Sequence, residues 1–378
     1  MDTGDKVTEK KHELDTDKFW QEDELAHENN CFNFAPQIAL GIRMSDECVF
    51  AELGEEGTPW MPIPLARRIE LNKRYNDKSE KIVGKRLLKE DFLPEDARFP
   101  SVKRIGEVFN GKYIYHNQTE WLTQSVHSSQ ELEALLDRVD KMDLRSFMLP
   151  ENWSQEKKRI CETYGVRPEL MRHIRGPVTF ACSIMGTENL LFLIMDEPDL
   201  ARRFSEAIAR VTLEMARVMD EECETSAKAT PGFSFADDNC CLLSPSMYEL
   251  FGFPVLENVF QVYSPNPHDM RYQHSDSAMG HLLPLLGKLD LNGVNFGPTV
   301  LIPEIRKHLP NARVDGCVSP MSFMRNDGKE LTSQVMRDCM DALQYNGVNI
   351  STAGSINNGS TLESMRLIMS LIQRYGRR

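Results

Sequence analysis

The sequence lacks the signatures of several common protein classes. Its nine cysteines include no Cys-x-x-Cys pair, which argues against a zinc ribbon and against a thioredoxin-like site. An odd number of cysteines in so long a chain also disfavours a secreted disulfide scaffold. No stretch approaches the roughly 18 apolar residues of a membrane span, and the polar N-terminus does not resemble a signal peptide. We therefore expect a cytoplasmic protein with no membrane partner.

Positive charge is also scarce. The chain has 44 lysines and arginines against 57 aspartates and glutamates, and its formal net charge is -13. An acidic surface repels nucleic acid, so we expect no nucleic-acid partner. The 378 residues are 41% hydrophobic, which is enough to bury a large core. The length suits one α/β barrel that carries additional segments.

The first part of the chain differs from the rest. Residues 1–105 are charge-dense with short apolar patches, and we interpret them as an N-terminal cap of helices and irregular segments. Beyond this point, apolar stretches typical of strands alternate with amphipathic patterns typical of helices. The predicted strands are 112–116, 177–184, 232–236, 270–274, 293–296, 312–317 and 348–352. The predicted helices are 131–139, 200–219, one opened by Ser244 and Pro245, 281–289, 303–309, 331–345 and 361–375.

This alternation predicts parallel βα units. We expect residues 106–378 to form a (β/α)8 TIM barrel, with residues 1–105 as its N-terminal extension. An open doubly wound sheet is the alternative, but no predicted strand is followed by a Gly-rich phosphate loop. In a βα barrel the active site lies at the C-terminal ends of the strands, so polar residues at those ends are the candidates for chemistry.

The clearest candidates are His274 and Asp276. Residues two apart in a strand project to the same side, so both side chains can point into the barrel mouth. An imidazole and a carboxylate at this spacing suit a metal ion or an oriented acid–base pair. A packed, hydrogen-bonded histidine is the plainer alternative.

The strand 232–236 is followed by Asp237, Asp238 and Asn239. Two adjacent carboxylates are costly to bury unpaired, so a metal, a cation or a substrate would explain them. The alternative is that one carboxylate caps the next helix and the other faces water. We treat Asp238 as a catalytic candidate, and Asp237 and Asn239 as candidates for substrate binding.

Two further strand ends carry polar side chains. Asn117 and Glu120 follow the strand 112–116, and Ser355 and Asn357 follow the strand 348–352. All four are candidates for substrate binding, although ordinary loop or turn residues would look the same. The cysteines are more typical of a buried core than of thiolate ligands.

From about Gly176 to the end, the chain resembles the uroporphyrinogen decarboxylase superfamily. The resemblance lies in Gly176-Pro177 before an apolar segment and in the stretches ADDNCCLLSPSMYELFGFPVLENVF, HSDSAMGHLLPLLGKLDLNGVNFGPT and TAGSINNGSTLESMRLI. The superfamily includes corrinoid-dependent methyltransferases. Tyr248 and Asn295 lie within the matching stretches and join the substrate-binding candidates.

The departures from the family pattern bear on function. True uroporphyrinogen decarboxylases carry an early Arg-Gln-Ala-Gly-Arg segment and a late histidine, and this chain has neither. Without an arginine cradle, a highly anionic porphyrinogen has no evident electrostatic support. The zinc methyltransferases of the family use a His-x-Cys pair and a late cysteine. Here His274 matches the histidine and Asp276 replaces the first cysteine, so Zn²⁺ held by these two residues is an expectation from the resemblance.

The resemblance implies an enzyme that moves a methyl group from a small methylated substrate, such as an O-methyl compound, to a corrinoid (cobalamin) protein. A lyase that decarboxylates a smaller carboxylate is the alternative, and a barrel that has lost its chemistry is a third. Methyl transfer predicts cobalamin-linked methyl release, whereas a lyase would release carbon dioxide without a corrinoid. A homodimer is left open as the assembly.

Overall fold

The computed structural model describes residues 14–378 except 58, 60 and 117–118. The chain divides into two compact units. Unit 1 contains Met1–Pro59, Glu70–Leu88 and Gly316–Arg378, and unit 2 contains Trp60–Ile69 and Lys89–Asp315. The domain boundary that the sequence suggests near residue 105 stays a prediction.

Unit 2 is built on a parallel sheet. Its strands are β4 (His173–Arg175), β5 (Phe233–Ala236), β6 (Arg271–Ser275), β7 (Gly293–Phe296) and β8 (Arg313–Asp315). Each pairs in parallel with the next along the chain, so the spatial order is the sequence order and β4 lies at the end of this series. A separate antiparallel hairpin joins β2 (Tyr113–His116) to β3 (Thr119–Leu122).

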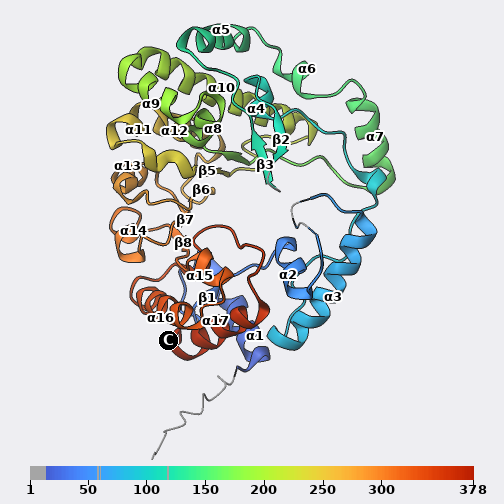
Figure 1. The fold of residues 1–378 in the computed structure, drawn as a ribbon, viewed down its shortest axis with the longest axis vertical. Coiled ribbons are helices and arrows are strands. Elements are labelled where there is room, and N and C mark those ends of the chain that lie inside the picture. Colours follow the sequence, from blue (N-terminus) through green and yellow to red (C-terminus); the bar gives the residue numbers. More distant parts are fainter. Residues whose placement is uncertain (1–13, 58, 60, 117–118) are drawn as a thin grey trace, which may run out of the picture. The chain divides into compact units, whose positions relative to one another are not determined.

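Helices connect the strands of unit 2 and lie outside them (Figure 1). They are α4 (Ile105–Val108), α5 (Ser129–Val139), α6 (Leu144–Met148), α7 (Trp153–Tyr164), α8 (Pro177–Met185), α9 (Thr187–Asp196), α10 (Pro198–Glu222), α11 (Pro245–Phe251), α12 (Phe253–Tyr263), α13 (Leu283–Leu286) and α14 (Ile302–His308). The 3₁₀ turns are η3 (Glu95–Ala97), η4 (Asp238–Leu242), η5 (Gly280–Leu282) and η6 (Gly287–Leu289). The core between sheet and helices contains aromatic pairs such as Phe235 against Phe260, whose ring centroids are 5.5 Å apart.

Unit 1 contains a second parallel pair of strands, β1 (Ala39–Leu40) with β9 (Val348–Ile350). Its helices are α1 (Thr16–Ala26), α2 (Val49–Leu53), most of α3 (Leu65–Val83), α15 (Pro320–Met324), α16 (Gly328–Tyr345) and α17 (Leu362–Tyr375), with 3₁₀ turns η1 (Glu28–Cys31) and η2 (Asp46–Cys48). Strand β1 belongs to the segment that the sequence suggested as a cap. Its two residues are too few to show a period in the sequence.

Most of the predicted elements are confirmed. Strand β7 has the predicted bounds, and β5, β6, β8 and β9 each differ from the prediction by one to three residues, counted over both ends. Helix α11 begins as expected, with Ser244 as the capping residue and Pro245 in the first turn. The predicted helix 281–289 is broken into η5, α13 and η6, where Pro284 and Gly287 interrupt regular helical bonding.

The predicted strand 177–184 is wrong, because these residues form helix α8. The helix is buried on nearly every side, so its apolar run has no polar face to reveal the helical period. The predicted strand 112–116 does form, but as β2 of the antiparallel hairpin rather than as part of the parallel sheet. The parallel strand in this part of the chain is instead β4, which lies just before α8.

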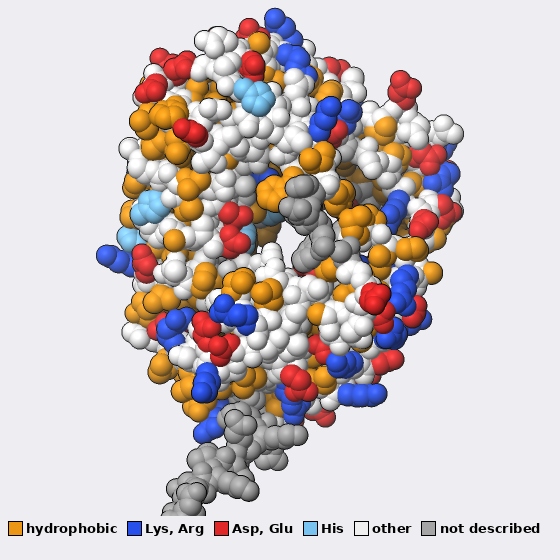
Figure 2. Space-filling model, viewed as in Figure 1, with side chains coloured by type: hydrophobic (Ala, Val, Ile, Leu, Met, Phe, Trp, Pro, Cys, Tyr) orange, Lys and Arg blue, Asp and Glu red, His pale blue; other side chains and the backbone are white. Residues whose placement is uncertain are grey.

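The surface carries charges of both signs. Figure 2 shows acidic and basic side chains interspersed over the face in view. Among the described residues, no single helix is long and apolar enough to cross a membrane. Helices α8 and α9, which meet at 106°, satisfy that criterion of length and composition only when taken together. The predicted cytoplasmic location stays a prediction.

Candidate functional site

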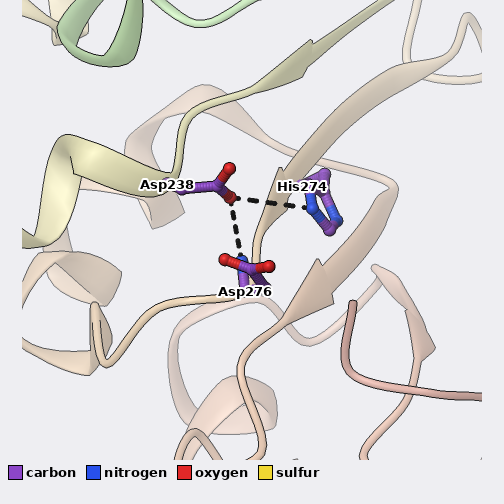
Figure 3. A group of neighbouring side chains, drawn as sticks. All are labelled: Asp238, His274 and Asp276. Atoms are coloured by element: carbon purple, nitrogen blue, oxygen red, sulfur yellow. Dashed lines mark hydrogen bonds and ion pairs between the residues drawn. The ribbon is translucent and has the colours of Figure 1, made fainter. Parts of the chain in front are cut away.

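Three polar side chains converge at the C-terminal ends of β5 and β6 in unit 2. Asp238 begins the turn η4 after β5, His274 lies in β6, and Asp276 follows β6 (Figure 3). One possible ligand atom from each lies within 4.8 Å of the others. The Nε2 atom of His274 is 3.7 Å from Oδ1 of Asp238, and the same oxygen accepts a hydrogen bond of 3.1 Å from the backbone N–H of Asp276. The predicted pair therefore gains a third member from the neighbouring strand.

The orientation of the His274 ring is set by Asn295 of β7. The Nδ1 atom of His274 is 2.8 Å from the amide oxygen of Asn295, and the amide nitrogen of Asn295 donates to the backbone carbonyl of Asp315. Because this second bond uses the donor side of the amide, the oxygen faces the imidazole and the proton of the neutral ring lies on Nδ1. Nε2 is thereby directed to the carboxylates.

The two carboxylates of the cluster affect each other. Burial raises the pKa of Asp276, the negative charge of Asp238 raises it further, and His274 acts in the opposite direction. Two carboxylates this close favour a shared proton or a shared cation. The Asp238 side chain is 40% exposed and that of His274 21%, so an incoming molecule can contact the cluster.

The donor set suits a metal ion. Zinc holds nitrogen and oxygen ligands at about 2.0–2.2 Å, which places tetrahedral ligands roughly 3.4 Å apart. The 3.7 Å between His274 and Asp238 is close to this value, and Asp276 can supply a third ligand. One imidazole and two carboxylates also suit harder ions such as Mn²⁺, since no thiolate takes part.

Asp237, next to the cluster, has a different environment. It is fully buried, and its carboxylate accepts hydrogen bonds from the backbone N–H groups of Thr179, at 2.7 Å, and Val178, at 3.4 Å. These groups belong to the first turn of α8, so Asp237 caps that helix. Gly176 makes this contact possible, because a Cβ atom there would lie 2.2 Å from that of Asp237. Burial raises the pKa of Asp237 to about 6.

A cavity of about 500 Å³ lies beside β4 in the same unit. Its wall includes His173 and Arg175 of β4, with Arg104, Tyr113 and Glu120. The pKa of His173 is lowered by burial and, to a smaller extent, by the neighbouring His274. Strand β4 was not predicted from the sequence, and neither were His173 and Arg175 as residues of a site. Three residues are too few to show the alternation of a strand, so the sequence offered no clear signal for β4.

A model of the uroporphyrinogen decarboxylase (URO-D) family matches residues 157–375, which is more than half of the chain. The chain belongs to the uroporphyrinogen decarboxylase family. Within the family's matched region lie all three cluster residues, Asp238, His274 and Asp276. No curated protein sequence matches the chain.

A solved structure described as a methyltransferase from Methanosarcina mazei is similar in fold, with a TM-score of 0.51. The two chains are 13% identical, and the match covers 81% of this chain and 86% of the other. At this identity the likeness shows the fold alone. Together with the family, it identifies the α/β architecture as a TIM barrel, as the sequence predicted.

The remaining predicted site residues lie in varied surroundings. Tyr248 of α11 is fully buried, so its side chain has no exposed surface for a ligand in this structure. The backbone N–H of Asn239 donates to the Thr179 hydroxyl at 2.9 Å. Ser355 and Asn357 belong to unit 1, where the Asn357 amide donates to the Ser355 carbonyl at 3.4 Å.

Glu120 forms an ion pair rather than a ligand cluster. Its carboxylate accepts two hydrogen bonds from the guanidinium of Arg104, at 2.7 and 3.0 Å, and this pairing lowers the pKa of Glu120. Asn117 lies outside the described residues. For all of these residues, a role in binding substrate stays a prediction.

Proposed function

We propose that this protein is a methyltransferase that moves a methyl group from a small methylated compound, such as an O-methyl compound, to a corrinoid protein. The observation that carries the proposal is the convergence of Asp238, His274 and Asp276 at the C-terminal strand ends of a barrel of the uroporphyrinogen decarboxylase family. Family membership and the barrel fold support it, and so does the absence from the sequence of the arginine-rich segment that a porphyrinogen would need.

The cluster can assist a departing heteroatom. When the bond between the methyl carbon and its oxygen, nitrogen or sulfur breaks, the electron pair stays on the heteroatom and needs a proton or a positive charge. In its imidazolium form, His274 would donate the Nε2 proton to that heteroatom, a contribution of about 10²–10⁴-fold. Asn295 keeps the ring in place during this transfer. A corrinoid on a partner protein would supply the nucleophile for the methyl carbon.

A metal would use the same residues. Asp238, His274 and Asp276 would hold it, and Zn²⁺ at this position would supply Lewis acidity toward the departing atom. Since an imidazole that binds a metal through Nε2 has no proton to donate from that atom, the metal-assisted and proton-assisted forms of the reaction exclude each other. Metal analysis of purified protein, wild type beside His274→Ala, separates them.

The test of the function is a transfer assay. Purified protein is incubated with cob(I)alamin and a panel of small methyl ethers, methylamines and methyl thioethers, and methylcobalamin is followed by its absorbance. We expect transfer by the wild type and a rate at least about a hundredfold lower for His274→Ala. Transfer at equal rates in both would contradict the role of the cluster.

Decarboxylation of a smaller carboxylate is the second candidate. It is favoured by the family itself and by Arg175, whose guanidinium lies at the cavity beside β4. Carbon dioxide released in the same incubations without any corrinoid would support it over methyl transfer.

A further inference from the structure

The cavity beside β4 has an uneven balance of charge. Lys103, Arg104 and Arg175 contribute to its wall, against the carboxylates of Glu120 and Glu169. Arg104 is neutralised by its two hydrogen bonds to Glu120, and its guanidinium also stacks on Tyr113, 3.2 Å from the ring centroid. The cavity therefore carries one more positive charge than negative.

Of the two other cations, Lys103 lies 3.8 Å from the carboxylate of Glu107, so Arg175 is the cation that a ligand can pair with. Its guanidinium donates to the Ser183 hydroxyl at 3.1 Å and, among the residues that the structure describes, has no carboxylate within ion-pairing distance. The residue is exposed, so a ligand can reach the guanidinium. A guanidinium presents a planar pair of donors that matches the two oxygens of a carboxylate.

The remaining wall is largely apolar. Side chains from β3, β4, α8 and α10 contribute to it, among them Leu122, Ile174, Phe180, Met215 and Met219. Methionine side chains adapt to ligands of different shape. A wall of this kind suits the hydrocarbon body of a small organic molecule rather than a free inorganic anion.

The register of the sheet connects Arg175 to the cluster. Arg175 of β4 lies opposite Ala236 of β5, and Ala236 lies opposite His274 of β6. Residues in register on parallel strands face the same side of the sheet. Neighbouring strands are about 4.8 Å apart, so the Cα atoms of Arg175 and His274 are separated by roughly 10 Å. Only Ala236, whose side chain is a methyl group, lies between them in this row.

We propose that the cavity binds an elongated organic anion whose carboxylate pairs with Arg175 and whose other end reaches His274. The identity of that other end, a methyl-bearing heteroatom, rests on the proposed function; the carboxylate site does not. The substrate class is thus a carboxylic acid with an apolar spacer between the acid and the methylated atom. Small neutral methyl donors would leave Arg175 without its partner.

Binding is tested by calorimetry with two probes, 6-methoxyhexanoate and its uncharged analogue 6-methoxyhexanamide. We expect the wild type to bind the carboxylate at least about tenfold more tightly than the amide, as for a hydrogen bond to a charged group. Arg175→Met keeps the aliphatic part of the side chain but loses the charge, so the preference should disappear. Arg175→Lys should retain part of it.

Arg203→Met is the matched control, because Arg203 pairs with Asp137 and Asp140 on the surface and does not contribute to the cavity wall. This variant should keep the full preference. Equal affinity of the wild type for both probes would overturn the proposal. So would a preference that persists in Arg175→Met, or no binding of either probe at millimolar concentration.

The two proposals can fail separately. If 6-methoxyhexanoate binds with an Arg175-dependent preference but never yields its methyl group to cob(I)alamin, the carboxylate site stands and methyl transfer fails. If neutral donors are demethylated while carboxylate and amide bind equally, methyl transfer stands and the carboxylate site fails. His274→Ala should leave the carboxylate preference intact, since it changes only the other end of the site.

Discussion

Asp237 and Asp238 are neighbours in the chain, yet the structure places them in opposite surroundings. Asp237 has no exposed surface and caps helix α8, whereas Asp238 is 40% exposed and faces His274 and Asp276. The backbone turns between them at the end of β5, so one carboxylate enters the packing around α8 and the other the polar cluster. Adjacent acidic residues can therefore divide into a structural group and a group free for chemistry.

The largest effect should come from the exposed member of the pair. Asp238→Asn keeps the shape of the side chain but removes the charge beside His274, so we expect methyl transfer to slow by about a hundredfold. The melting temperature should hardly change, because Asp238 is not part of a buried network. A variant that loses stability together with activity would show that Asp238 is structural and would remove the contrast with Asp237.

The buried member should affect stability instead. Asp237→Ala leaves the first N–H groups of α8 without an acceptor, which should lower the free energy of unfolding by about 1–3 kcal/mol. Asp237→Asn is the matched control, because its amide oxygen can still accept from Thr179. Denaturant unfolding at neutral pH measures both, and equal stability of the alanine and asparagine variants would contradict the capping role.

The stability of the wild type relative to Asp237→Asn should also depend on pH. Because the pKa of Asp237 is raised to about 6 in the folded state, the protonated form is favoured there. The stability this contributes is full below the unfolded pKa and is lost as pH rises through about 6. Relative to Asp237→Asn, the wild type should therefore lose on the order of 2–3 kcal/mol between about pH 4 and pH 7. A constant difference across this range would contradict the burial of the carboxyl.

The smallest effect concerns a carboxylate that is paired near the surface. Glu120→Gln breaks the ion pair with Arg104, but both side chains are partly exposed, so the loss should be below about 1 kcal/mol. Since the pairing lowers the pKa of Glu120, its contribution is present at neutral pH and lost as pH falls through the folded pKa. Unfolding at neutral and at acidic pH checks this. If Glu120→Gln lowered the free energy of unfolding as much as Asp237→Ala does, solvent exposure would not explain the difference between a surface carboxylate and a buried one.

Local patterns in the sequence were sufficient for much of the fold and for part of the site. The alternation of strands and helices predicted the α/β barrel, and β5, β6 and β7 appeared close to their expected bounds because their apolar runs are bounded by turn residues. The spacing of His274 and Asp276 placed both at one strand end. These features depend on a few consecutive residues, so the sequence alone determined them.

Only the tertiary structure decided which carboxylate joins the cluster, which one caps α8, and where the cavity lies. A fully buried helix and a fully buried strand are both almost entirely apolar, so the sequence of residues 177–184 could not show which of the two they form. The three residues of β4 are too few to show a period, and Arg175, Ala236 and His274 come into register only when their strands pair. Contacts between segments far apart in the chain depend on how the elements pack together, and a pattern of a few consecutive residues does not determine that packing.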